Sequence, residues 1–229
     1  MTIKYHTEFD QGSGAWLKAR KGIVTASAFS KLLTSTLKVA NNDKTRAHFY
    51  QILCDRITPH LEENFESWDM KRGKEDEIFA RELYSETYHN VEECGFVTND
   101  EHGDFTLGYS PDGLVGNDGL IEVKSRLNAI QVRAVMEDLI EWRVPKDDVL
   151  QVQAALLVTG RKWCDYIVYS RGLPMVKVRA EPIPEIHTAM IDVVTDVESR
   201  LKDQIGKYKE FISQFPATEY IPFSQGIGV

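Results

Sequence analysis

The chain of 229 residues lacks several features that define whole classes of protein. It has only three cysteines, at 54, 94 and 164, an odd number without the close spacing of metal ligands, which excludes a disulfide scaffold and favours a reducing compartment. No apolar run approaches the roughly 20 residues that cross a bilayer, and the first residues lack the apolar core of a signal peptide. Repeats and Pro/Ser-rich linkers are missing too. We therefore expect one soluble domain over residues 1–229, without a membrane partner.

Positive charge is also scarce. Lysine and arginine number 27 against 35 aspartates and glutamates, a net charge of −8. As a global field this charge would repel a polyanion, so a nucleic-acid partner needs a local basic groove. Two classes of protein fit the balance: those that never meet phosphate, and those whose carboxylates hold divalent cations that reverse the local sign.

Apolar residues are sufficient for a core, at 42% of the chain. Their spacing alternates between helical and strand-like periods. We expect helices over 25–33, from 43 onward, over 75–86, 128–142, 149–158 and 184–211, and strands in three runs between 91 and 123 and at 163–170 and 174–180. Strands flanked by helices on both sides predict an α/β fold around a mixed central sheet.

Chemistry concentrates in residues 108–124, where Asp112, Glu122 and Lys124 fall within 13 residues. Carboxylates beside apolar neighbours need a cationic partner, and oxygen ligands suit Mg²⁺ or Mn²⁺. Hydrolysis of a phosphodiester uses such ions to prepare a water nucleophile and to neutralise the leaving oxygen, and two ions about 4 Å apart can share these roles. Lys124 would orient or deprotonate the water, or stabilise the pentacoordinate phosphate. The alternative is an ordinary Pro-Asp-Gly turn followed by an exposed Glu-x-Lys strand.

A hairpin can bring these groups together. If residues 117–119 form a three-residue loop ending in a left-handed glycine, Gly116 faces Leu120 and Asp112 lies opposite Lys124. The glutamate, two residues before Lys124, then projects from the same face. A two-residue loop would place Asp112 on the other face. We expect the three-residue loop.

The pattern Pro-Asp…Glu-x-Lys resembles the signature of the PD-(D/E)xK nuclease superfamily. The likeness extends to the YqaJ-like viral recombinase family, the nucleases of the phage lambda exonuclease type. Four blocks carry it in the order of the family: 16–27, 73–81, 110–114 with 122–124, and 151–153. They span about 60% of the chain.

The resemblance implies a restriction-endonuclease-like core and a role for each matching residue. Asp112 would bridge the metal ions, Glu122 would bind one of them, and the backbone carbonyl of Val123 would be a further ligand. Lys124 would be the catalytic lysine, and Glu77 would complete the metal site from a helix.

Two neighbouring residues compete with members of this set. Glu75 is the other candidate for the position of Glu77. We prefer Glu77 because its distances from both ends of the block 73–81 match the family; the alternative for Glu77 is a solvated helix face. Gln151 would lie beside the catalytic centre. Gln153 is about 200° further round a helix, so both glutamines cannot point inward.

A second implied site holds the 5′ phosphate of the degraded strand, in a pocket of Arg20, Ser27 and Ser110. Guanidinium grips phosphate bidentately, and serine hydroxyls donate hydrogen bonds. The alternatives are a surface salt bridge for Arg20 and capping or turn bonds for the serines. Met70 aligns with an apolar wedge that splits the terminal base pair, or else packs in the core. The segment 38–46 departs from the family, and we transfer no role to it.

The resemblance implies a Mg²⁺-dependent exonuclease that enters at duplex DNA ends, with two ions per site and with Mn²⁺ as a substitute for Mg²⁺. It would release 5′ mononucleotides and leave a 3′ single-stranded tail for a phage-encoded single-strand annealing protein, in the cytoplasm of a bacterial host. A toroidal homotrimer around the DNA would make it processive, and a basic lining inside an acidic outer face would accommodate the net charge. The alternatives are a site- or structure-selective endonuclease and an inactive DNA-binding module of the same fold.

Overall fold

A computed structural model describes residues 2–61 and 67–221 of the chain. Its helices are α1 Gly14–Arg20, α2 Phe29–Leu32, α3 Asp43–Ile57, α4 Trp68–Thr87, α5 Asn128–Glu137, α6 Lys146–Thr159 and α7 Pro184–Ile212, with short 3₁₀ turns η1 Ala26–Ala28 and η2 Leu139–Glu141. Its strands are β1 Ile3–His6, β2 Val24–Thr25, β3 Phe96–Asn99, β4 Leu107–Tyr109, β5 Gly113–Val115, β6 Gly119–Ser125, β7 Trp163–Tyr169 and β8 Val176–Ala180. Within the described ranges, no helix combines the length and apolar character needed to span a bilayer.

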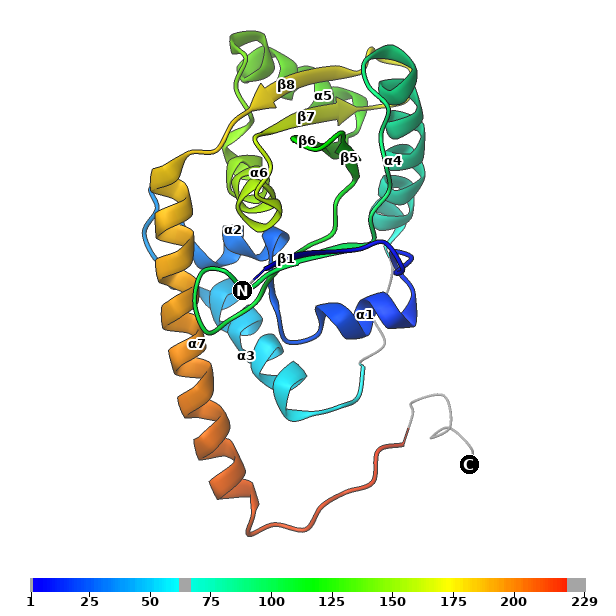
Figure 1. Cartoon of the computed structure of the whole chain (residues 1–229). Coiled ribbons are helices and arrows are strands. Elements are labelled where there is room, and N and C mark those ends of the chain that lie inside the picture. The colour runs from blue at the N-terminus through cyan, green and yellow to red at the C-terminus, as the bar shows by residue number, and fades with distance from the viewer. Residues whose placement is uncertain (1, 62–66, 222–229) are drawn as a thin grey trace.

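The strands form two mixed sheets flanked by helices (Figure 1), which confirms the predicted fold class but divides the expected single sheet. The first sheet has the order β1-β3-β4-β2 and the second β5-β6-β7-β8. In the second sheet β6 and β7 are parallel, and the other pairs are antiparallel. Residues 110–112 connect β4 of the first sheet to β5 of the second. The predicted site therefore lies where the chain passes between the sheets.

Helix α6 lies between the two sheets and packs against β3, β4 and β7. It is apolar around most of its circumference, and nearly every residue from Leu150 to Thr159 is buried. The helix ends at Gly160, whose φ of 64° gives the left-handed conformation that terminates helices, as the sequence predicts. This central position brings Gln151 to the second sheet.

Helix α4 covers the other face of the second sheet. Ala80 and Tyr84 are fully buried against Ile121 and Val123 of β6. Because side chains alternate along a strand, Glu122 points to the opposite face, toward α6. Strand β6 is therefore enclosed on both sides and holds its polar side chains in a fixed place.

The hairpin between β5 and β6 has a different register from the predicted one. Val115 pairs with Gly119, so the loop consists of residues 116–118, and Gly116 takes the left-handed conformation with φ 50°. The prediction that Gly116 faces Leu120 is wrong by two residues. An even shift leaves every side chain on its predicted face, so the carboxylates and the lysine still share one face.

Gly119 is required for a reason outside the hairpin. A Cβ atom there would lie only 2.1 Å from the ring of Trp163 on β7. The tryptophan ring therefore occupies the space that a side chain at position 119 would need.

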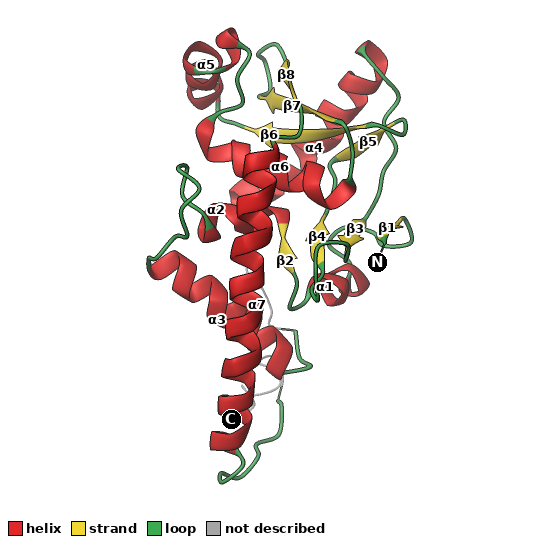
Figure 2. Ribbon diagram, turned by 60° about the vertical axis from the view of Figure 1, so that its left-hand side comes forward, coloured by secondary structure: helices red, strands yellow, loops and turns green. Residues whose placement is uncertain are grey.

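Helix α7 runs alongside α3, and its C-terminal end extends well past the sheets (Figure 2). Arg56 of α3 and Glu198 of α7 form a bidentate ion pair with both N–O distances at 2.6 Å. Glu198 is buried, so the pair joins the two helices at a fixed point. The three cysteines are free thiols.

Candidate active site

The structure brings four of the predicted residues together on the α6 face of the second sheet. Lys124 Nζ donates to Glu122 Oε1 at 2.8 Å and to Gln151 Oε1 at 2.9 Å. Gln151 Nε2 in turn donates to Glu122 Oε1. Asp112 joins them from the segment before β5, while Gln153 is buried elsewhere and bonds to the backbone at residue 181.

The oxygens of Glu122 differ in how many of their lone pairs are used. Oε1 accepts from both Lys124 and Gln151, which occupies its two lone pairs. Oε2 accepts one hydrogen bond, from the hydroxyl of Tyr109 at 2.7 Å, and keeps one lone pair. Burial and the charge of Glu122 raise the pKa of Tyr109 well above its usual value, so the hydroxyl remains a donor.

The carboxylate of Asp112 accepts a backbone hydrogen bond from β6 just before the start of β5. Strand β5 begins one residue later, and Asp112 Oδ2 accepts from the backbone N–H of Val123 at 2.6 Å. The residue as a whole is partly exposed, although its carboxyl group is enclosed. Burial of its carboxyl and the negative charges of Glu122 and Glu77 raise its pKa well above the usual value, which marks an excess of negative charge at this point.

Glu77 lies nearby on α4, held by Arg81 one turn later. Arg81 Nη1 lies 3.2 Å from Glu77 Oε1 and also donates to the backbone carbonyl of Asp112 at 3.1 Å. Burial raises the pKa of Glu77 to about 7, against the lowering effect of Arg81 and with a further rise from Glu122. The Arg81 contacts connect α4 to the segment that carries Asp112.

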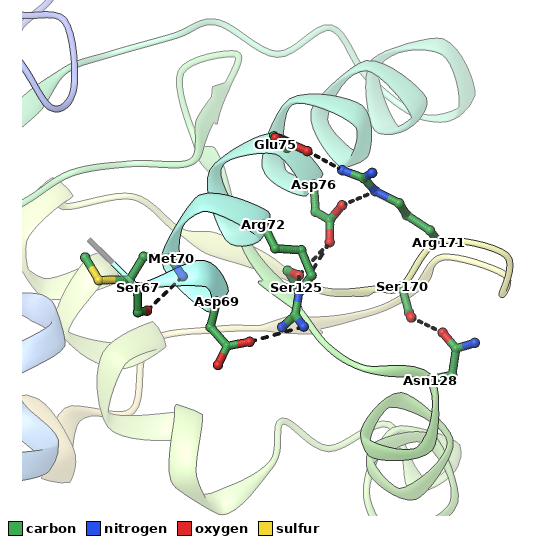
Figure 3. A network of polar contacts seen from close by, with 10 residues as sticks. All are labelled: Ser67, Asp69, Met70, Arg72, Glu75, Asp76, Ser125, Asn128, Ser170 and Arg171. Atoms are coloured by element: carbon green, nitrogen blue, oxygen red, sulfur yellow. Dashed lines mark hydrogen bonds and ion pairs between the residues drawn. The ribbon is translucent and has the colours of Figure 1, made fainter. Parts of the chain in front are cut away.

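A polar network fixes α4 against the end of β6 (Figure 3). The buried carboxylate of Asp76 accepts from Ser125 Oγ at 2.7 Å and from Arg171 Nε at 2.6 Å, and Arg72 Nε donates to Ser125 Oγ at 3.2 Å. Glu75 pairs with Arg171 at the surface and does not join the site. Because Ser125 follows Lys124 directly, the network fixes α4 relative to the lysine.

Asp112 and Glu122 fit a divalent cation. Both present carboxylate oxygens with unused lone pairs, and a cation would offset the burial and the repulsion by Glu122 and Glu77 that raise the pKa of Asp112. Among residues 2–61 and 67–221, no three His, Cys, Asp or Glu side chains are close enough to hold a metal by themselves. A two-carboxylate site leaves room for water and substrate, the coordination that Mg²⁺ favours.

The predicted phosphate pocket centres on Ser110 and the end of α1. The guanidinium of Arg20 donates to Ser110 Oγ and stacks on the ring of Trp16 at 4.2 Å. Trp16 Nε1 donates to Ser110 Oγ at 3.0 Å and to the Gly95 carbonyl at 2.9 Å. With both lone pairs of the serine oxygen occupied, its proton can be donated to an anion. Burial lowers the pKa of Arg20 to about 10, which still leaves it charged at neutral pH.

Ser27 does not join this pocket. It is exposed, and its only hydrogen bond within the described residues is a 3.5 Å contact with Thr25. Met70 is half-exposed and lies in the first turn of α4, next to the exposed Trp68, rather than in the core. It lines a cavity of about 800 Å³ together with Arg20 and Glu77.

Three residues at the site were not assigned a role from the sequence. Arg81 carries a weak signal, because a glutamate and an arginine four apart on a helix are neighbours. Trp16 stands within the first family block, but nothing in its spacing indicates a contact with Ser110. Tyr109 gives no local signal, since its partner is on a strand of the other sheet.

The model of the YqaJ-like viral recombinase domain matches residues 15–162, which include the site residues named above. The chain belongs to this family. Membership of the YqaJ-like family implies a nuclease. A search of curated proteins gave no significant match.

Solved structures agree with the YqaJ-like assignment. LHK-Exo, an alkaline exonuclease from Laribacter hongkongensis, is 27% identical, with a TM-score of 0.70 over 87% of this chain and 100% of its own. The structure of LHK-Exo in complex with dAMP is 28% identical, with a TM-score of 0.75 over 88% of this chain and 99% of its own. A phage-related exonuclease from Haemophilus somnus 129PT, at 10% identity and a TM-score of 0.57 over 84% of this chain and 99% of its own, shares the fold.

Proposed function

We propose that the protein is a Mg²⁺-dependent 5′–3′ exonuclease that acts at the ends of duplex DNA, releases 5′ mononucleotides and leaves a 3′ single-stranded tail. The observation that carries the proposal is the convergence of Asp112, Glu122 and Lys124, with Gln151, on one face of the sheet. The binding of dAMP by the related LHK-Exo supports a mononucleotide product.

Asp112, Glu122 and the Val123 carbonyl would hold one ion, and Glu77 would contribute to a second, since the described carboxylates are not close enough for three of them to hold one ion together. Mg²⁺, or Mn²⁺ in its place, supplies an activated water and neutralises charge on the phosphate, and two ions can divide these tasks. The chain itself contributes orientation: the amide of Val123 holds Asp112, and Gln151 holds Glu122.

Lys124 would act as a cation. Burial lowers its pKa, but the charge and hydrogen bond of Glu122 outweigh burial and the pKa is raised. Two of its three N–H donors are used, by Glu122 and Gln151, and the third is left for substrate. These contacts favour stabilisation of the phosphate or orientation of the water over removal of a proton.

The direction of digestion would follow from the pocket at Ser110. Arg20 and the Ser110 hydroxyl would bind a terminal 5′ phosphate, and Met70, which lines the same cavity as Arg20, would separate the terminal base pair. The preferred substrate is then a 5′-phosphorylated duplex end.

The proposal extends to assembly. A homotrimeric ring around the duplex would make digestion processive, and the 3′ tail would pass to a phage-encoded annealing protein in the bacterial cytoplasm. A basic channel with an acidic exterior accommodates the net charge of −8.

The deciding experiment compares wild type with Asp112→Asn on an end-labelled linear duplex and on a closed circle, with and without Mg²⁺. Asparagine keeps an acceptor for the Val123 N–H but loses the charge, so we expect folding and DNA binding to be retained. The rate of hydrolysis should fall more than about 100-fold. This loss exceeds the 10- to 100-fold effect typical of removing a residue that only hydrogen-bonds to a metal ligand. Asp118→Asn in the exposed hairpin loop is the matched control and should stay active. Cutting of the circle by wild type, or full activity of Asp112→Asn, would overturn the proposal.

A further inference from the structure

We propose that Tyr109 is a positioning residue that sets the orientation of the Glu122 carboxylate for metal binding; this inference rests on the proposed function. The two residues belong to different sheets, Tyr109 to β4 and Glu122 to β6. Both are 2% exposed, and the phenol donates to Glu122 Oε2 at 2.7 Å. The bond is thus a buried polar link between the two sheets at the catalytic strand.

The other contacts of Glu122 restrain the carboxylate at one oxygen only. Lys124 and Gln151 both bind Oε1, and the terminal torsion of a glutamate is broad, so without the phenol any rotation of the group is opposed by contacts at a single oxygen. Tyr109 binds the second oxygen and restrains the carboxylate from the opposite side of the torsion axis. One lone pair of Oε2 then remains, in a fixed direction, for an ion.

Hydrogen-bond partners of metal ligands have a measurable effect, because their loss typically costs 10- to 100-fold in metal affinity or activity. A tyrosine with a merely structural role would behave differently. Its hydroxyl would contribute to folding, and the affinity for metal would not depend on it.

The chain provides a matched control in Tyr166. It is also fully buried, and its hydroxyl also donates to a buried carboxylate, Asp148 Oδ2, at 2.6 Å. Asp148 pairs with Arg126 and has no assigned role in metal binding. Tyr109→Phe and Tyr166→Phe therefore each remove a buried hydroxyl that donates to a buried carboxylate, one at the proposed metal site and one beside it.

The test is calorimetric titration of the full-length protein with Mn²⁺ in the absence of DNA, together with thermal unfolding. We expect Tyr109→Phe to raise the Kd for Mn²⁺ about 10-fold or more, and Tyr166→Phe to leave the Kd within error of wild type while lowering Tm similarly. In nuclease assays, Tyr109→Phe should need more Mg²⁺ for half-maximal rate and recover when Mg²⁺ is in excess.

The outcomes separate this inference from the proposed function. If wild type binds Mn²⁺ and Tyr109→Phe binds it equally well, the role of Tyr109 is refuted and the nuclease proposal stands. If wild type binds no Mn²⁺ and hydrolyses no DNA, the proposed function fails first. Equal loss of Mn²⁺ affinity in both variants would also refute a specific role for Tyr109, because it would indicate general destabilisation.

Discussion

Replacement of Arg20 by alanine tests the proposed recognition of the 5′ end. The change removes a guanidinium that is held over Trp16 at 4.2 Å and bonded to Ser110, while both neighbours remain. A hydrogen bond to a charged group is worth about 1.5–3 kcal/mol. At about 1.4 kcal/mol per factor of ten, its loss should lower kcat/KM on 5′-phosphorylated ends roughly 10- to 100-fold. Ends with a 5′ hydroxyl should be nearly unaffected.

The assay measures kcat/KM on two duplexes that differ only in the 5′ phosphate. Arg20→Lys should recover part of the preference, since lysine keeps the charge but not the bidentate geometry. Arg133→Ala removes an exposed arginine outside the pocket and is the control. If Arg20→Ala keeps the wild-type ratio between phosphorylated and hydroxyl ends, the pocket does not read the phosphate.

Two further predictions concern stability. Gly119→Ala forces a methyl group against Trp163 and should lower the free energy of unfolding by about 1–3 kcal/mol, seen as a fall of several degrees in Tm. Gly206→Ala is the control, because it lies in an open helical position and should raise Tm. An unchanged Tm for Gly119→Ala would contradict the close packing. Burial lowers the pKa of His48 from 6.5 to about 4, so the unfolded chain binds a proton that the folded protein excludes and stability falls as pH drops from 6.5 to 4. Urea unfolding of His48→Gln should show a weaker loss over this interval, and parallel curves for the two proteins would count against the shift.

Elements with local signals were predictable from the sequence. Helix α3 begins at Asp43 and α6 ends at Gly160, as expected, because capping residues mark those ends. Helix α4 begins at Trp68 instead of residue 75, because the Ser67 side chain caps it by accepting from the Met70 N–H. The helix expected to reach residue 142 stops at Glu137 and is followed by a 3₁₀ turn.

Features that depend on distant partners were not predictable. Strand β1 pairs with β3, more than 80 residues away, so its own sequence gives no sign of the pairing. Gly119 lies against Trp163 of β7, a contact that no rule of turn geometry includes. The faces of Asp112, Glu122 and Lys124 were predicted correctly because parity, unlike exact register, survives an even shift.

The linker Ser110-Pro111-Asp112 joins the pocket at Arg20 to the candidate metal site at Asp112. It contains only two peptide bonds, so its Cα atoms can be at most about 7 Å apart, close to the interval between successive phosphates of a strand. Pro111 is buried, and its ring restricts the backbone. Under the proposed function this tripeptide sets the distance from the anchored 5′ end to the phosphodiester bond that is cut. The bond within reach is then one nucleotide from the end, so every cut releases a single nucleotide.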